Sequence, residues 1–303
     1  MKVAVIMSTY NGEKYISEQI DSILNQTGVE VELFIRDDGS KDNTVKIMEE
    51  YRQKHSNVHV DTGINLGFRQ SFIQELLSVR GYEYYAFSDQ DDYWEKEKLY
   101  QACLKLQKVK TGKPAVYYSN LNVADANLNV YRTTKLQNRK KSLESLVMRR
   151  SIAGCTMVFN ECLWNKIAEV DVTDDMLKRG HDSFILSLCY ALGGTVMCDS
   201  NAYIRYRQHT SNASGSSHGA IQRMKKEWGM LVKKKGTEPA IARSILENWE
   251  KEMHPEEIKE LQLIAKSESS IPARLKIVAS RKFVTGNLSL TVVGKMKALF
   301  GLL

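Results

Sequence analysis

The first two hundred residues alternate between short apolar runs and stretches with helical spacing, and this alternation limits the folds open to the chain. The run 3–7 is apolar and partly β-branched, as in a strand covered on both faces. Further strands are predicted at 31–36, 58–61 and 84–87, and helices at 15–24, 44–54 and 68–79. This order predicts an α/β, Rossmann-like fold with a mainly parallel sheet and helices on both faces.

Composition narrows the class of protein without identifying it. The 303 residues are 43% hydrophobic and 26% charged, as in an ordinary soluble globular protein. The net charge of +7 suits acidic substrates or an anionic membrane surface. A nucleic-acid partner is not expected, because the basic residues gather in the C-terminal part without an aromatic-rich platform.

The cysteines and the apolar segments predict where the chain works. Five scattered cysteines with no Cys-x-x-Cys spacing indicate reduced thiols rather than disulfides or a zinc site. No stretch approaches the roughly 20 apolar residues that a membrane-spanning helix needs. We therefore expect a cytoplasmic protein, either free or peripheral on the inner face of the cell membrane.

An acidic loop, Ser-Asp-Gln-Asp-Asp-Tyr-Trp at 88–94, directly follows the apolar run at 84–87. Its three carboxylates repel one another unless a positive charge compensates them, and a hard divalent cation held by oxygen atoms does so at the end of a buried strand. The loop therefore predicts a Mg²⁺ or Mn²⁺ site for a diphosphate. The alternative is a solvated turn in which Asp91 or Asp92 caps a helix that starts near Trp94.

Two other polar loops, at 9–12 and 37–40, also follow predicted strands. In parallel sheets, ligands bind outside the carboxyl ends of the strands, so the three loops are expected to converge on one site. For 37–40 the alternative is a plain turn whose aspartates cap the next helix, because Asp and Gly are common turn residues.

Four motifs together resemble the family 2 glycosyltransferases of GT-A fold. They are Val-Ile-Met-Ser-Thr-Tyr-Asn-Gly at 5–12, Arg-Asp-Asp-Gly-Ser at 36–40, Asn-Leu-Gly at 65–67 and the acidic loop. The resemblance covers residues 1 to about 215, and implies a catalytic domain at 1–215 and a C-terminal helical region at 216–303. The spelling of the acidic loop, with Gly-His-Asp at 180–182 and the segment 206–215, more closely resembles bacterial rhamnosyltransferases.

The resemblance implies an inverting transfer of a sugar from a nucleotide-diphosphate donor to a saccharide or lipid-linked acceptor. The narrower match implies L-rhamnose from dTDP-rhamnose, in the synthesis of a cell-surface polysaccharide such as a capsule or cell wall. Another hexose or N-acetylhexosamine from a UDP-sugar is the alternative. A third hypothesis is a nucleotide-binding scaffold that lost catalysis, although the full set of matching polar residues speaks against it.

On the nucleotide side, the resemblance implies that Asp38 accepts the N3–H of uracil or thymine. The backbone around Thr9, Tyr10 and Asn11 would complete the base pocket. Asn65 and Arg69 would line the ribose or phosphate; a turn residue and a solvated helix face are equal alternatives for these two.

On the metal side, the resemblance implies that Asp91 binds the ion directly and that Asp89 lies near the ribose. His209 would be a further contact to the ion or the diphosphate, although a lone histidine is often only packed or exposed. The ion would offset the charge that develops on the leaving diphosphate.

For catalysis, the apolar pattern predicts a helix that opens at His181-Asp182, and the resemblance implies that Asp182 takes the acceptor proton. A helix-capping role for Asp182 is the alternative and is compatible with a base. The family commonly has Glu-Asp here, so His181 is a departure. Trp94, and Gly154 and Cys155 on an expected strand at 154–159, would shape the sugar or acceptor pocket with His181; Trp94 could equally be core.

The chain changes character after a polar linker at 211–218 and becomes helical and basic. The stretch 288–303 combines apolar residues with Lys295 and Lys297, as in a tail that docks on an anionic membrane leaflet near a lipid-linked acceptor. The alternative is packing against the catalytic domain or against a second copy in a homo-oligomer.

Overall fold

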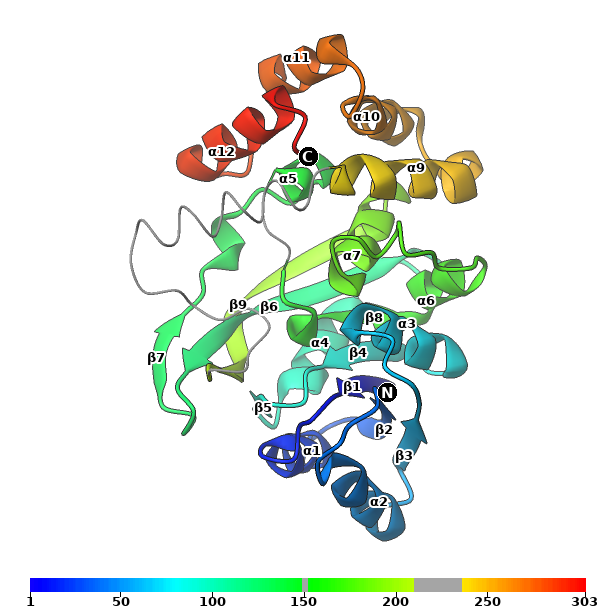
Figure 1. The fold of residues 1–303 in the computed structure, drawn as a ribbon, viewed down its shortest axis with the longest axis vertical. Helices are drawn as coiled ribbons and strands as arrows, with labels where there is room; N and C mark the ends of the chain where they lie inside the picture. The colour runs from blue at the N-terminus through cyan, green and yellow to red at the C-terminus, as the bar shows by residue number, and fades with distance from the viewer. Residues whose placement is uncertain (149–151, 210–235) are drawn as a thin grey trace. The chain divides into compact units, whose positions relative to one another are not determined.

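The computed structural model describes residues 1–148, 152–209 and 236–303. Its described strands form one nine-stranded sheet in the order β3-β2-β1-β4-β8-β6-β9-β5, and β7 pairs with β6 outside this path (Figure 1). The strands are β1 (Lys2–Thr9), β2 (Glu30–Asp37), β3 (Val58–Thr62), β4 (Tyr84–Ser88), β5 (Tyr93–Trp94), β6 (Ala115–Ala124), β7 (Val130–Thr133), β8 (Val158–Asn160) and β9 (Thr195–Arg207).

The first four strands are parallel, as the alternating pattern predicted. They are joined by α1 (Ile16–Leu24), α2 (Thr44–Lys54) and α3 (Phe68–Ser78), which lie where helices were expected. The register pairs Thr9 with Asp37, and Met7 with Ser88. The loops that follow β1, β2 and β4 therefore meet at one edge of the sheet, the edge at which parallel α/β sheets bind ligands.

The other half of the sheet is mixed, which the sequence patterns did not predict. Strand β8 runs antiparallel to both β4 and β6, whereas β6 and β9 are parallel. Two local expectations were wrong. Residues Gly154–Thr156 form a 3₁₀ turn, η2, and the strand expected at 154–159 begins only at Val158. The helix expected to start near Trp94 starts instead at Lys98, as α4 (Lys98–Leu106), because Tyr93–Trp94 pair with β9.

The core explains why β1 is apolar at every position. Val3, Val5 and Met7 pack in one cluster with apolar residues of α1, α2 and α4. The alternate residues Ala4 and Ile6 point to the opposite face and are also fully buried. A strand covered by helices on both faces buries every side chain, so it shows no polar alternation.

The chain divides into two compact units. The first comprises Met1–Gln137, Ile152–Asp171 and Thr195–His209, and the second comprises Asn138–Ser151, Val172–Gly194 and Thr210–Leu303. The single boundary expected at 215 stays a prediction, and that residue and the linker at 211–218 lie outside the described residues. The basic residues predicted to follow, from Arg223 to Lys235, also lie outside them.

The described α-helices of the second unit are α5 (Leu143–Val147), α7 (His181–Ala191), α9 (Thr237–Trp249), α10 (Pro255–Lys266), α11 (Ile271–Ala279) and α12 (Leu288–Leu299). In the first unit, α6 (Glu161–Ala168) follows β8. Among the described helices, none has both the length and the apolar character to cross a membrane.

Candidate active site

Asp91 and His209 meet at the end of the sheet. Strand β5 follows the acidic carboxylates directly and pairs antiparallel with β9, so the residues just before β5 lie beside those just after β9. As a result, His209 Nε2 lies 2.8 Å from Asp91 Oδ2. The His209 ring also lies 4.9 Å, between centroids, from the ring of Tyr15. Both residues had been predicted as metal contacts, and the structure places them together.

Arg207 holds the acidic loop in place, a role that the sequence analysis missed. Its side chain is buried, and its Nε donates to the Asp91 carbonyl at 2.8 Å. Its backbone N–H donates to Asp92 Oδ1 at 3.1 Å. Its guanidinium also bonds the Ala126 carbonyl, at 2.5 Å, and the Glu18 carboxylate. One buried arginine thus joins the acidic loop to α1 and to the turn after β6.

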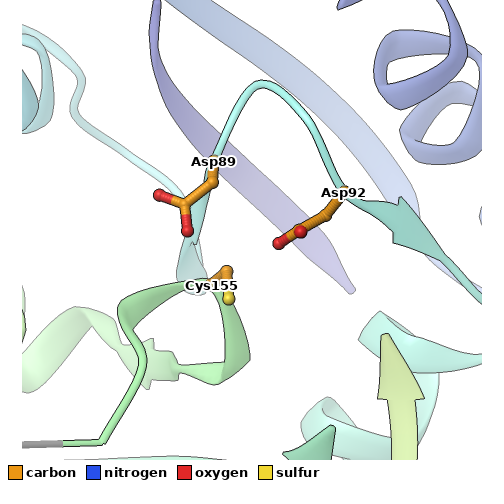
Figure 2. A group of neighbouring side chains, drawn as sticks. All are labelled: Asp89, Asp92 and Cys155. Carbon is orange, nitrogen blue, oxygen red and sulfur yellow. The ribbon is translucent and has the colours of Figure 1, made fainter. Parts of the chain in front are cut away.

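Asp92 is the buried carboxylate of the acidic loop. Asp92 is fully buried, and burial raises the pKa of its carboxyl well above 3.8, with the negative charges of Asp89 and Asp91 adding to the effect. Figure 2 shows Asp89 and Asp92 on the loop with the Cys155 side chain, from η2, facing them. One ligand atom of each lies within 4.8 Å of the others. Neither Asp91 nor Asp92 caps a helix, because the N-cap of α4 is Glu97.

The donor atoms of the site fit a hard divalent cation at Asp91 and His209 better than at Cys155. Burial raises the pKa of the Cys155 thiol well above 9.0, so the thiolate that binds metals is disfavoured there. Mg²⁺ and Mn²⁺ prefer oxygen ligands, and Mn²⁺ also accepts imidazole. Two neighbouring ligands at metal distances of about 2.1 Å are themselves about 3 Å apart, close to the separation of Asp91 Oδ2 and His209 Nε2.

Trp94 belongs to the core, one of the two alternatives that the sequence left open. It has no exposed surface, and Lys98 Nζ lies 3.4 Å from the centroid of its ring. Burial lowers the pKa of Lys98 to about 7, because the charged ammonium loses its water. Trp94 therefore lines no open pocket in this structure and instead packs in the hydrophobic core.

Asp38 joins the loop after β2 to the loop before α3. Its Oδ1 accepts from Arg36 Nη1 at 2.7 Å and from the Leu66 N–H at 2.8 Å. Its Oδ2 accepts the Gly67 N–H at 2.8 Å, which leaves this oxygen capacity for one more donor. The helix-capping alternative was wrong, because Asp37 instead accepts from Gly39 N–H within its own turn and α2 is preceded by Asn43.

Gln90 links the first loop to the acidic loop. Its Oε1 accepts from the Tyr10 N–H at 2.9 Å and from the Thr9 hydroxyl, and its Nε2 donates to the Tyr10 carbonyl at 3.2 Å. A Cβ added at Gly12 would lie 2.3 Å from Gln90 Oε1, so glycine makes room for this contact. The sequence offered no signal for this role of Gln90. Gln90 stands between Asp89 and Asp91, and the metal-site prediction depended on the charge of those two carboxylates.

The other predicted nucleotide residues lie at the same edge. The Asn11 N–H donates to Ser40 Oγ at 2.8 Å, and Asn11 Oδ1 accepts the Lys41 N–H at 2.9 Å. Asn65 Oδ1 accepts the Gly67 N–H at 3.2 Å, and Arg69 lies in the first turn of α3. Large apolar side chains are exposed beside them, namely Tyr10, Ile64, Leu66 and Phe68. Exposed aromatic side chains provide faces on which a nucleotide base can stack, so this surface suits a base.

The sequence model of the family described as "Glycosyl transferase family 2" matches residues 4–163, more than half of the chain. The chain belongs to glycosyl transferase family 2. A curated relative of this glycosyltransferase, dTDP-rhamnosyl transferase RfbG of Shigella flexneri, is 29% identical over 230 residues, which cover 70% of this chain and 74% of that one.

Solved structures confirm the GT-A fold predicted for this glycosyltransferase. Staphylococcus aureus TarS 1–349 in complex with UDP aligns with a TM-score of 0.57 at 19% identity, over 99% of this chain and 89% of that one. Mannosyltransferase PcManGT from Pyrobaculum calidifontis, in complex with GDP-Man and Mn²⁺, aligns with a TM-score of 0.51 at 15% identity, over 98% and 87% of the two chains. At these identities the likeness establishes the fold alone.

The predicted base of this glycosyltransferase lies in the second unit. Helix α7 opens at His181 as predicted, and the Ser183 N–H donates to Asp182 Oδ1 at 2.7 Å. Gly180 precedes the helix with a φ of 122°, and a Cβ there would lie 2.5 Å from Asp182 Oδ1. His181 is buried. The carboxylate of Asp182 thus sits at a helix N-terminus, and its role as a base stays a prediction.

Proposed function

We propose that this family 2 glycosyltransferase moves L-rhamnose from dTDP-rhamnose, with inversion, onto a saccharide or lipid-linked acceptor of a bacterial cell-surface polysaccharide. The observation that carries the proposal is the convergence of Asp91 and His209, 118 positions apart, at a loop that Gln90 joins to Tyr10. The neighbouring Thr9 carbonyl accepts the N–H of Asp38, which links the Asp38 loop to the same edge. The choice of sugar rests on the relative described as a dTDP-rhamnosyl transferase, which this chain resembles over 70% of its length.

In this proposal the parallel-strand edge holds the nucleotide. The free capacity of Asp38 Oδ2 would accept the N3–H of thymine, with Thr9, Tyr10 and Asn11 around the base and Asn65 and Arg69 on the ribose or phosphate side. Because Arg36 and two backbone N–H groups already fix the Asp38 carboxylate, it is oriented before the ligand arrives.

Asp91 and His209 would hold Mg²⁺ or Mn²⁺, with Asp89 beside them. The ion, when bound, would supply the positive charge that offsets the leaving diphosphate. The chain's own part is to fix the loop: Arg207 and Gln90 anchor it from two sides, so that Asp91 is positioned independently of the donor. Asp91 Oδ2 and His209 Nε2, hydrogen-bonded to each other in this structure, are the two atoms that would hold the ion.

Asp182 would take the proton from the acceptor hydroxyl as that oxygen attacks the anomeric carbon. A single displacement needs one base and one stabilised leaving group, and inverts the anomeric carbon. A β-linked donor would therefore give an α-rhamnoside. His181, Gly154 and Cys155 stay candidates for the sugar or acceptor pocket, although Cys155 is buried in this structure. The five scattered cysteines, with no Cys-x-x-Cys spacing, suit the reducing cytoplasm in which we place the enzyme.

Transfer of another hexose or N-acetylhexosamine from a UDP-sugar is the second candidate. Uracil and thymine both offer an N3–H to Asp38, so that contact does not discriminate between the two bases. The fold neighbour TarS has also been solved in complex with UDP-GlcNAc. A donor comparison separates the two candidates.

The test measures nucleoside diphosphate release from dTDP-rhamnose, UDP-glucose and UDP-N-acetylglucosamine, with Mn²⁺ and a mixture of saccharide acceptors. We expect the fastest release from dTDP-rhamnose. Release only from a UDP-sugar would keep the glycosyltransferase and discard rhamnose. Donor binding without release from any donor, both with and without acceptors, would instead favour the scaffold.

A further inference from the structure

Helix α12 packs with its small side chains inward and its large apolar side chains outward. Gly294 and Ala298 are buried, and a Cβ at Gly294 would lie 2.7 Å from the Met148 carbonyl, so the helix lies very close to the end of α5. The exposed positions are apolar and large: Val292, Val293, Met296, Leu299 and Phe300 are each at least 38% exposed. A helix that packs only on its own domain shows the reverse arrangement.

The neighbouring helix α11 adds to this apolar surface. Ile271 and Leu275, one turn apart, are 65% and 52% exposed. Among the described residues, nine of the fifteen exposed large apolar side chains lie between Ile271 and Phe300. Scattered exposed apolar residues are ordinary, but a concentration on two adjacent helices marks an interaction surface. The exposed apolar side chains of α11 and α12 together form one apolar surface: Ile271, Leu275, Leu288, Leu290, Val292, Val293, Met296, Leu299 and Phe300.

The net charge of residues 269–303 indicates what kind of partner the apolar surface binds. Residues 269–303 contain six Lys or Arg residues and no Asp or Glu, so this segment has a net charge of +6. A second copy would bring an equally positive surface to the contact, and like charges repel. A layer of anionic lipid headgroups over an acyl region complements both the positive charge and the apolar side chains.

The basic side chains fall into two groups. Those engaged within the second unit include Lys282, whose Nζ is 2.9 Å from Glu260 Oε1, and Arg274, which bonds the Ser267 and Glu268 carbonyls. Lys276, on α11, and Arg281, just after that helix, are exposed. Lysine and arginine beside apolar side chains reach headgroup phosphates while the apolar groups enter the interface.

We infer that the apolar surface binds peripherally to an anionic membrane, with Val292, Met296 and their neighbours entering the headgroup boundary and Lys276 and Arg281 contacting lipid phosphates. This extends the proposed function by naming the surface that brings the enzyme to a lipid-linked acceptor. The binding itself requires no donor, metal or acceptor, so it is measured apart from transfer.

The test is co-sedimentation of the full chain with phosphatidylcholine vesicles and with vesicles that also contain phosphatidylglycerol. We expect binding to the anionic vesicles that weakens with salt, and little binding to phosphatidylcholine alone. Val292→Asp/Met296→Asp should weaken binding at least about tenfold, because each buried apolar side chain contributes about that much or more. Lys276→Gln and Arg281→Gln should each weaken it about fivefold.

The control variant is Val130→Asp/Tyr131→Asp on β7, where Val130 is 47% exposed, close to the 53% of Val292. It should bind vesicles like the unmodified chain. Unchanged thermal unfolding checks that each variant is folded. Sedimentation velocity without lipid tests whether a second copy of the chain covers the apolar surface instead. A dimer that Val292→Asp/Met296→Asp breaks, or a monomer that binds no vesicles, would overturn the inference. Donor turnover in solution should stay unchanged in every variant, so failure here leaves the proposed function intact.

Discussion

His209 Nε2 and Asp91 Oδ2 lie 2.8 Å apart although 118 positions separate them in the chain. The antiparallel pairing of β5 with β9 produces this proximity. A second pair of the same kind, His59 Nε2 and Glu32 Oε2 at 2.7 Å, lies on the surface. Both pairs join a histidine Nε2 to a carboxylate oxygen, but only the first lies in the candidate site. The His59–Glu32 pair therefore serves as the control for the His209–Asp91 pair.

His209→Ala should weaken Mn²⁺ binding in the presence of dTDP, because it would remove one of the two proposed ligands. Loss of a ligand or its support commonly costs about 10- to 100-fold in metal affinity. The free Mn²⁺ signal in electron paramagnetic resonance measures this directly. The control His59→Ala should leave Mn²⁺ affinity unchanged, and equal affinity in both variants would remove His209 from the metal site.

Arg207→Lys should loosen the acidic loop while keeping the positive charge. Lysine cannot reproduce the three directions in which Arg207 donates, and the loss of one or two buried hydrogen bonds costs about 1–3 kcal/mol. We expect a higher Mn²⁺ concentration for half-maximal activity and a lower midpoint of thermal unfolding. Arg205→Lys, two positions earlier on β9 and paired with Glu95 at the surface, is the control. A fall in stability alone, with the Mn²⁺ dependence unchanged, would make Arg207 only a structural residue.

Gly12→Ala should raise the KM for the donor, since the new Cβ would force Gln90 away from Tyr10. Gln90→Ala should also raise the KM, by about 5- to 10-fold for the loss of one or two hydrogen bonds. The double variant tests the mechanism: if Gly12 acts by making room for Gln90, its effect should be small once Gln90 is absent. Additive effects would show that the two act separately.

Glu75→Gln should stabilise the protein at alkaline pH. Burial, and then the charge of Asp61, raise the pKa of Glu75 from 4.5 to about 7. Below pH 4.5 the Glu75 carboxyl is protonated in both the folded and the unfolded protein. As the pH rises from 4.5 to about 7, this carboxyl ionises freely only in the unfolded chain, so the free energy of unfolding falls. The loss is complete above the folded-state pKa and amounts to at most about 3 kcal/mol.

Urea unfolding at about pH 5 and about pH 8 checks this, because the variant's advantage should grow with pH. Glu50→Gln, at an exposed position on α2, is the control. An advantage for Glu75→Gln that is the same at both pH values would exclude a buried carboxyl with a raised pKa.

Asp182→Asn should retain donor binding and lose transfer, because the amide cannot accept the acceptor proton. General bases contribute about 10²- to 10⁴-fold to rate. Single-turnover rates with donor at saturation, alongside the donor Kd, separate the two effects. Asp175→Asn, at an exposed position before the same helix, should be unaffected. Substantial turnover by Asp182→Asn would leave Asp182 only the role of an acidic residue in the first turn of α7.

The parallel half of the fold was predictable because buried parallel strands appear as continuous apolar runs, such as 3–7. Strand β8 has three residues, which is too short to give a pattern, and its antiparallel insertion between β4 and β6 depends on tertiary contacts. For that reason the expected strand at 154–159 was misplaced and the mixed half of the sheet was not foreseen.

The site was predictable where charge is concentrated in sequence, and not where a role depends on a distant partner. Asp91 stands in a crowded acidic run, whereas Arg207 and Gln90 acquire roles only through atoms of other loops. The sequence also left the position of Trp94 open, since whether an aromatic side chain after a strand packs inward depends on β5 joining β9.

We propose that Asp91 and His209 hold the ion through which the donor diphosphate is bound. Titration calorimetry of dTDP-rhamnose into the full chain, with Mn²⁺ and then with a chelator, tests it most directly. We expect binding that is at least about tenfold tighter with Mn²⁺, and a Mn²⁺ effect that Asp91→Asn abolishes. Equal affinity with Mn²⁺ and with chelator would exclude a metal ion between these two residues and the donor diphosphate.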